Sequence, residues 1–66
     1  MIRYDNLWKT MKAREITQYT LTQKYGISKS LLHRLRNNKG VNMNTIDTLC
    51  YILDCNIEDI ATYYKD

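Results

Sequence analysis

The side chains best suited to chemistry are gathered in one short segment, residues 29–37. Lysine and arginine donate hydrogen bonds to guanine, serine pairs with several bases, and histidine also forms hydrogen bonds. In a helix, four such residues share the polar face: Lys29, Ser30, His33 and Arg34. An α-helix fits the major groove of double-stranded DNA, where each base pair presents its own pattern of donors and acceptors. We therefore expect these four side chains to contact DNA bases.

Catalytic and metal chemistry lack the residues they need. His33 is the single histidine, and no nucleophile with an adjacent base and no glycine-rich phosphate loop accompanies it. Zinc needs three or four protein ligands, more than Cys50, Cys55 and one distant histidine provide. We expect no enzyme activity, no catalytic residue, no metal site and no cofactor. Both cysteines are interpreted as small core residues.

A helix-turn-helix is predicted to hold the polar segment. Thr17 is a suitable N-cap for a helix that ends at Tyr25, and Gly26 comes next, where a left-handed backbone is needed. Ser28 then caps the next helix, Lys29 to Asn37. A turn this short, centred on glycine, makes the two helices cross steeply, as in the helix-turn-helix motif.

Apolar residues at helical spacing predict three further helices, so the expected fold class is all-α with five helices. The first covers about residues 4–14, the fourth runs from an N-cap at Asn42 to Asp54, and the fifth follows an N-cap at Asn56. Ile27 is expected to be a buried turn residue. The side chains predicted to face inward from the helices are Leu7, Met11, Leu21, Tyr25, Leu32, Leu35, Met43, Ile46, Leu49, Cys50, Leu53, Ile57, Ile60 and Tyr64.

Charge is distributed unevenly along the chain. Residues 1–40 carry nine lysines or arginines and two acidic residues, whereas residues 41–66 carry one lysine and five acidic residues. This asymmetry indicates one side that faces a polyanion and another side with a different use. No apolar stretch is long enough for a signal peptide or a membrane span, so we expect a cytoplasmic protein with no membrane contact. No residue cluster suggests a small-molecule effector.

The segment ITQYTLTQKYGISKSLLHRL resembles the helix-turn-helix of the phage-repressor and Cro type, the Xre-like regulators. Downstream, NTIDTLCYILDCNIEDI is similar to the fourth and fifth helices of that family. The resemblance extends over nearly the whole chain and implies one compact λ-repressor-like domain over residues 1–66. It also implies a sequence-specific, DNA-binding transcriptional regulator, with repression as its expected action.

The resemblance implies roles for individual residues. Gln18 matches the glutamine that opens the family's second helix, where it contacts a phosphate and braces the first base-reading residue. Lys29, Ser30 and Arg34 match the positions that usually reach bases, with His33 beside them. The residues expected to contact the DNA backbone are Thr17, Gln18, Asn37 and Lys39.

Three residues depart from the family's pattern. Thr22 replaces the usual alanine, and we expect its hydroxyl to bond the carbonyl four residues earlier. Glu15 and Asp54 stand where glycine is common. Aspartate tolerates the left-handed backbone that such positions require, so the fold is expected to survive these changes.

Double-stranded DNA and a second copy of the chain are the expected partners. One recognition helix reads too few base pairs to find a single site in a genome, so two copies are expected on a palindromic operator. The acidic C-terminal third carries apolar side chains beyond the needs of its core, and these are expected at the dimer surface: Tyr51, Ile52, Tyr63 and Tyr64. Two alternatives stay open, a protein-interaction or antitoxin-like module with the same shape, and an accessory DNA-binding protein of a mobile element.

Overall fold

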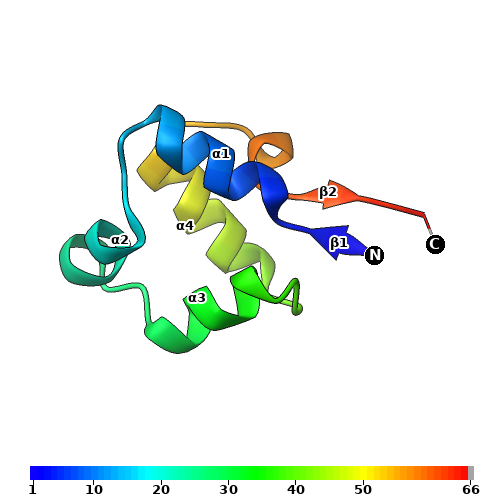
Figure 1. The fold of residues 1–66 in the computed structure, drawn as a ribbon, viewed down its shortest axis with the longest axis horizontal. Helices are drawn as coiled ribbons and strands as arrows, with labels where there is room; N and C mark the ends of the chain where they lie inside the picture. The colour runs from blue at the N-terminus through cyan, green and yellow to red at the C-terminus, as the bar shows by residue number, and fades with distance from the viewer. Residues whose placement is uncertain (66) are drawn as a thin grey trace.

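The computed structural model describes residues 1–65, in which four α-helices surround one core (Figure 1). A short strand precedes the first helix, and a 3₁₀ turn and a second strand come after the fourth. In chain order the elements are β1 (Ile2–Arg3), α1 (Asp5–Ala13), α2 (Gln18–Tyr25), α3 (Lys29–Arg36), α4 (Met43–Leu53), η1 (Ile57–Asp59) and β2 (Thr62–Tyr63). None of the helices in this part of the chain is long and apolar enough to cross a membrane.

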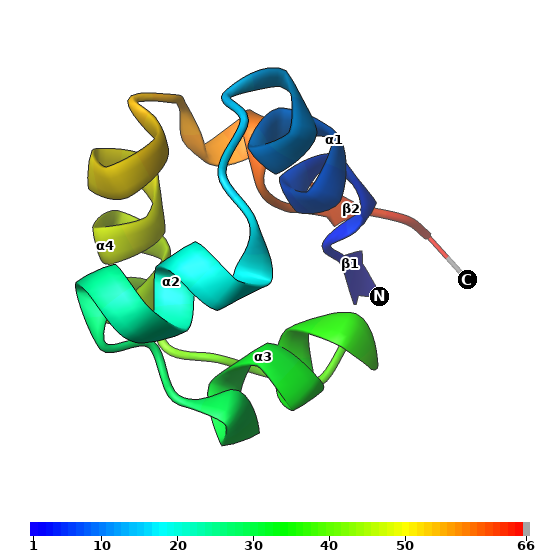
Figure 2. The same ribbon diagram turned by 60° about the vertical axis from the view of Figure 1, so that its left-hand side comes forward.

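Helices α2 and α3 form the predicted helix-turn-helix, and each begins after its predicted N-cap. The Thr17 hydroxyl accepts a hydrogen bond from the Thr20 N–H at 3.1 Å, and the Ser28 hydroxyl accepts one from the Leu31 N–H at 3.0 Å. Gly26 ends α2 with φ 71°, a left-handed conformation that glycine adopts easily because it has no Cβ. In Figure 2 the helix α3 lies along the lower edge of the molecule, below α2.

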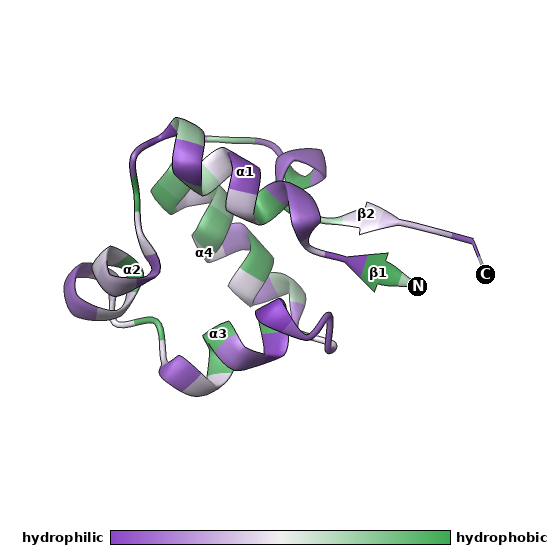
Figure 3. Ribbon diagram, in the orientation of Figure 1, coloured by the Kyte–Doolittle hydropathy of each residue, from purple (hydrophilic) through white to green (hydrophobic). Residues whose placement is uncertain are grey.

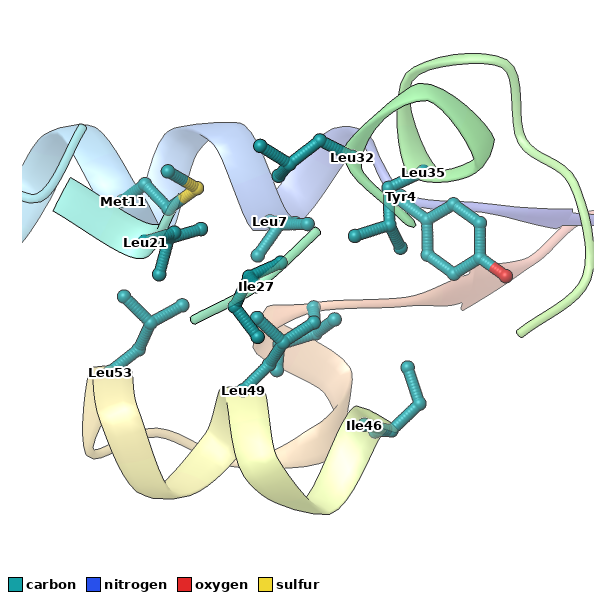
Figure 4. Packing of buried hydrophobic residues seen from close by; sticks show 11 residues of the cluster. Tyr4, Leu7, Met11, Leu21, Ile27, Leu32, Leu35, Ile46, Leu49 and Leu53 are labelled. Carbon is teal, nitrogen blue, oxygen red and sulfur yellow. The ribbon is translucent and has the colours of Figure 1, made fainter. Parts of the chain in front are cut away.

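Buried apolar side chains from all four helices form the core (Figure 4). They are Tyr4, Leu7, Met11, Leu21, Ile27, Leu32, Leu35, Ile46, Leu49, Leu53 and Ile60. All of these except Tyr4 belong to the predicted inward-facing set or, for Ile27, to the predicted buried turn, so those assignments are confirmed. Because α3 places Leu32 and Leu35 in the core, its opposite side is left to solvent.

The prediction of a fifth α-helix is wrong. The chain begins a helical turn where expected, and the Asn56 N–H donates to the Asp59 carboxylate at 3.0 Å, but only the 3₁₀ turn η1 forms. The strand β2 then pairs antiparallel with β1, with Ile2 opposite Tyr63. Thr62 and Tyr63 favour an extended backbone, and pairing with the N-terminal strand satisfies their backbone groups. The fold is therefore four helices with a small ribbon that joins the two ends of the chain.

Several apolar residues that were predicted to face inward do not reach the core: Tyr25, Met43, Cys50, Ile57 and Tyr64. Ile57 and Tyr64 are each 47% exposed. Their predicted burial assumed that this segment is one α-helix, and it forms only a 3₁₀ turn followed by a strand. Tyr25 is the last residue of α2 and Met43 the first of α4, so both lie beyond the ends of the buried stripes. Cys50 is half-buried at the edge of the core.

The three departures from the expected family pattern are accommodated. Glu15 (φ 58°) and Asp54 (φ 50°) have the left-handed backbone that glycine would adopt. Arg14 stabilises the end of α4, because its guanidinium donates to the carbonyls of Leu53 at 2.8 Å and Asp54 at 3.0 Å. The Thr22 hydroxyl donates to the carbonyl four residues earlier at 3.1 Å, as predicted.

Candidate nucleic-acid interface

The outer side of α3 is polar and exposed, and Figure 3 shows hydrophilic residues along much of this helix. Lys29, Ser30 and His33 are all exposed there, while Leu32 and Leu35 fix the opposite side of the helix to the core. Within residues 1–65 the side chains of Lys29 and Ser30 form no hydrogen bond. Their ammonium and hydroxyl groups are therefore available to a ligand.

Arg34 is exposed but already engaged. Its Nε and Nη2 groups both donate to the Gly40 carbonyl oxygen, at 2.9 Å and 2.7 Å. The guanidinium thus lies against the loop after α3 and holds that loop beside the helix. The two N–H groups of Nη1 and the second one of Nη2 are not used by this contact, which the sequence pattern did not indicate.

Asn37 ends α3 and turns its amide back onto the helix. Its Nδ2 donates to the His33 carbonyl at 2.8 Å, which satisfies one of the free carbonyls in the last turn. The same nitrogen lies 3.4 Å from His33 Nδ1. An amide nitrogen carries two N–H donors and the carbonyl takes one, so Asn37 has a second donor for a phosphate or for the His33 ring.

The loop after α3 is fixed from the N-terminal side of the chain. The Tyr4 hydroxyl donates to the Lys39 carbonyl at 2.9 Å, and the Tyr4 N–H donates to Asn38 Oδ1 at 3.0 Å. Tyr4 is 3% exposed, and its ring packs at the end of the core in Figure 4. The Lys39 side chain is exposed and makes no ion pair within residues 1–65, so this loop presents one lysine at the C-terminal end of α3.

The Tyr4 contact supports a first prediction. Replacing Tyr4 with phenylalanine removes one hydrogen bond from a buried hydroxyl but keeps the ring, so the free energy of unfolding is expected to fall by about 1 kcal/mol. Urea unfolding followed by circular dichroism measures this difference. Tyr51→Phe is the matched control, because Tyr51 is 86% exposed and should unfold like the wild type. Equal stability of Tyr4→Phe and wild type would contradict a stabilising role for the bond to Lys39.

The other end of the surface lies where α2 begins. The Thr17 hydroxyl is occupied by the helix cap and by a 3.0 Å contact with the Thr20 hydroxyl. The Gln18 Oε1 accepts a hydrogen bond from Arg36 Nη1 at 2.5 Å. A groove of about 330 Å³ separates α2 from α3 at this point, lined by Gln18, Tyr19, Thr22, Gln23, Lys29, Leu32 and Arg36. Side chains of both helices of the helix-turn-helix therefore contribute to this groove.

The cysteines lie away from this surface, near the end of α4. Both are half-buried free thiols, and the Cys55 N–H donates to the Cys50 carbonyl at 3.1 Å. Burial raises the pKa of the Cys55 thiol, and the nearby Cys50 and Asp59 raise it further, which favours the neutral thiol. Within residues 1–65 no group of three or more histidine, cysteine, aspartate or glutamate side chains is placed to hold a metal ion.

Two contacts at this surface were missed in the sequence. The spacing of Tyr4 to Leu7 and Met11 continues the inward stripe of α1, so periodicity alone was sufficient to place Tyr4 in the core. Arg36 was not among the residues expected to contact DNA. Its contact with Gln18 joins residues 18 positions apart, and no local pattern signals such a pair.

Two short helices joined at a glycine, the second with a basic and polar outer face, define a helix-turn-helix domain of the DNA-binding type. Residues 6–66 match the family model of the Cro/C1-type HTH DNA-binding domain. The chain therefore belongs to the Cro/C1-type HTH family, and the resemblance noted in its sequence is confirmed.

A solved structure supports the same assignment. The crystal structure of transcriptional regulator VanUg, Form II, is similar to this fold with a TM-score of 0.87 at 28% sequence identity. The similarity covers 98% of this chain and 87% of that one. The sequence matches none of the curated proteins with which it was compared.

Proposed function

We propose that this protein is a sequence-specific regulator of transcription that inserts α3 into the major groove of double-stranded DNA. The observation that carries the proposal is the exposed outer side of α3, where Lys29, Ser30 and His33 stand opposite the buried Leu32 and Leu35. A helix anchored in this way presents its polar side chains rigidly to base edges. The similarity to VanUg, which is a transcriptional regulator, supports a role in transcription.

The proposed division of roles follows the side-chain partners. Lys29, Ser30 and His33 read bases directly, and Arg34 joins them after it exchanges the Gly40 carbonyl for a base. Gln18 and Lys39 donate to DNA phosphates at the two ends of the surface, beside Thr17 and Asn37. Thr17 and Asn37 use their side chains mainly to cap α2 and α3, so they place backbone groups beside the phosphates. Repression is the proposed outcome, because a domain seated in the groove competes with other proteins for the same base pairs.

Binding of fluorescent random-sequence duplexes, measured by anisotropy at several salt concentrations, tests the DNA-binding part of this proposal. Affinity is expected to fall as salt rises, with a log–log slope of about 0.9 for each phosphate contacted. Selection from a random duplex pool should then converge on one sequence. Lys29→Ala is expected to weaken binding, whereas Lys9→Ala, on α1 across the core from α3, should not (Figure 1). Absence of duplex binding at low salt would leave the protein-interaction module as the better proposal.

A homodimer on a palindromic site is the second part of the proposal. The ribbon brings exposed apolar residues from both ends of the chain together, among them Ile2 (44% exposed), Tyr63 (66%) and Tyr64 (47%). Figures 1 and 2 both place this ribbon near the end of α3 that is farther from α2. A two-fold contact there would set two copies of α3 into successive major grooves about 34–36 Å apart.

The expected result for this interface is a change in cooperativity. Wild-type protein should bind a palindromic duplex as a pair, and Tyr63→Asp should bind each half-site singly because a buried carboxylate opposes the contact. Tyr51, which was also expected at the dimer surface, is exposed on α4 outside the ribbon, so Tyr51→Asp is the matched comparison for an interface formed by the ribbon alone. Ile52, the other residue of α4 expected at the dimer surface, is partly buried against the core. Sedimentation of the protein–DNA complex gives the stoichiometry, and one wild-type copy per palindrome would contradict the dimer.

A further inference from the structure

A single hydrogen bond links the two ends of the helix-turn-helix surface. Arg36, the last residue of α3, donates from Nη1 to Oε1 of Gln18, the first residue of α2, at 2.5 Å. Both residues line the groove between the helices. The contact therefore fixes a side chain at the beginning of α2 from the far end of α3.

The chemistry of arginine decides which way the Gln18 amide faces. A guanidinium has only donors, so the glutamine atom beside it must be the carbonyl oxygen and not the amino group. The two N–H bonds of Gln18 Nε2 then point away from Arg36, and within residues 1–65 no acceptor takes them. An amide held in this orientation offers donors to a ligand that only accepts, such as a phosphate.

The other three arginines also donate hydrogen bonds to groups within the fold. Arg3 donates to Asp5, Arg14 to the end of α4 and Arg34 to Gly40, so every arginine of the chain makes hydrogen bonds inside the fold. Lys29 and Lys39, which flank the proposed DNA surface, have no such partner within residues 1–65. The arginines brace the structure through their forked donors, whereas the ammonium groups of Lys29 and Lys39 stay available to a ligand.

We infer that Arg36 is a positioning residue for DNA binding, which orients the Gln18 amide as a donor to a backbone phosphate. This inference rests on the proposed function, because it assigns Arg36 a part in the same surface. The alternative is that Arg36 is one more cation at the DNA. The two differ in a measurable way, because a positioning residue acts only through Gln18 and a direct contact acts independently of it.

A double-mutant cycle on a random-sequence duplex tests the inference by anisotropy, with Gln18→Ala, Arg36→Ala and the double variant. Each single change is expected to weaken binding about fivefold, the size of one net hydrogen bond, and the double variant should be no weaker than either. The slope of affinity against salt should stay at the wild-type value in Arg36→Ala, because an arginine that does not touch phosphate releases no counterion. Arg36→Lys should restore most of the affinity, since an ammonium also donates to Oε1.

Three outcomes overturn the inference. Additive losses, roughly 25-fold in the double variant, would show that Arg36 acts without Gln18. A fall of about 0.9 in the salt slope of Arg36→Ala would make Arg36 a direct phosphate contact. In either case wild-type binding leaves the proposed function intact, whereas a wild-type protein that binds no duplex overturns both proposals. Thermal melting of each variant serves as the control, and unchanged melting is expected because Arg36 is exposed and Gln18 half-exposed.

Discussion

Replacing Leu32 with alanine is expected to lower the free energy of unfolding by about 2–5 kcal/mol, because it removes buried methyl groups and leaves a cavity in the core. Leu32 is 3% exposed and is the residue by which the middle of α3 enters the core (Figure 4). Domains of this size have thin cores and total stabilities near the lower end of about 5–15 kcal/mol. The variant should therefore be largely unfolded in modest urea, as measured by circular dichroism.

Leu31→Ala is the matched control for this prediction. Leu31 lies next to Leu32 on the same helix but is only half-buried against the core, so the same change removes less buried area and should cost clearly less. If the two variants unfolded alike, or Leu32→Ala unfolded like the wild type, α3 would face the core with a different side. The proposed DNA surface would then be wrong as well, since it depends on which side of α3 is outside.

The helix-turn-helix could be predicted from sequence because its determinants are local. Thr17 and Ser28 cap helices whose N–H groups lie three residues away, and Gly26 is needed for its own backbone conformation. The apolar stripes repeat within single helices, so the buried residues of α1 to α4 could be inferred from spacing alone. The exposed positions of Lys29 and His33 result from the same spacing, as the complement of the buried stripe.

The end of the chain could not be predicted in this way. Asn56 and Asp59 carry a good helix-start signal, and they do form one turn. The path beyond that turn is decided by strand β1, because residues 62 and 63 pair with residues at the opposite end of the sequence. Two-residue strands have no periodicity to detect, and their pairing depends on how α1 brings the N-terminus beside the C-terminus.

The hydrogen-bond partners of the surface side chains were the other feature that could not be predicted from sequence. Arg34 and Asn37 were expected to contact DNA, but Arg34 is bonded to Gly40 and Asn37 to the carbonyl of His33, and the neighbouring Arg36 is bonded to Gln18. These partners depend on the path of the loop after α3 and on the crossing of α2 with α3. Sequence spacing thus predicted which residues are exposed, and not which of them are already engaged.

Arg34→Ala is expected to weaken binding to the selected DNA sequence by about 1–3 kcal/mol and to relax the choice of one or two base pairs. In the free protein two of the five guanidinium N–H groups, on Nε and Nη2, share a single oxygen of Gly40. Guanine offers two acceptors, O6 and N7, which match the same fork of donors. Exchange of Gly40 for guanine therefore replaces one shared acceptor oxygen by two acceptors, O6 and N7, which offsets the loss of the contact with the loop.

Lys29→Ala is the companion variant. The Lys29 side chain makes no hydrogen bond within residues 1–65, so the change in DNA affinity of this variant reports base reading alone. Binding of both variants to the selected duplex and to random duplexes, measured side by side, separates two roles for Arg34. A larger loss on the selected duplex means that Arg34 reads a base. Equal losses on the two duplexes, with Lys29→Ala still selective, would mean that Arg34 contacts a phosphate or holds the loop that carries Lys39, and reads no base. Melting curves complete the comparison, since the loop contact predicts a lower melting temperature for Arg34→Ala and an unchanged one for Lys29→Ala.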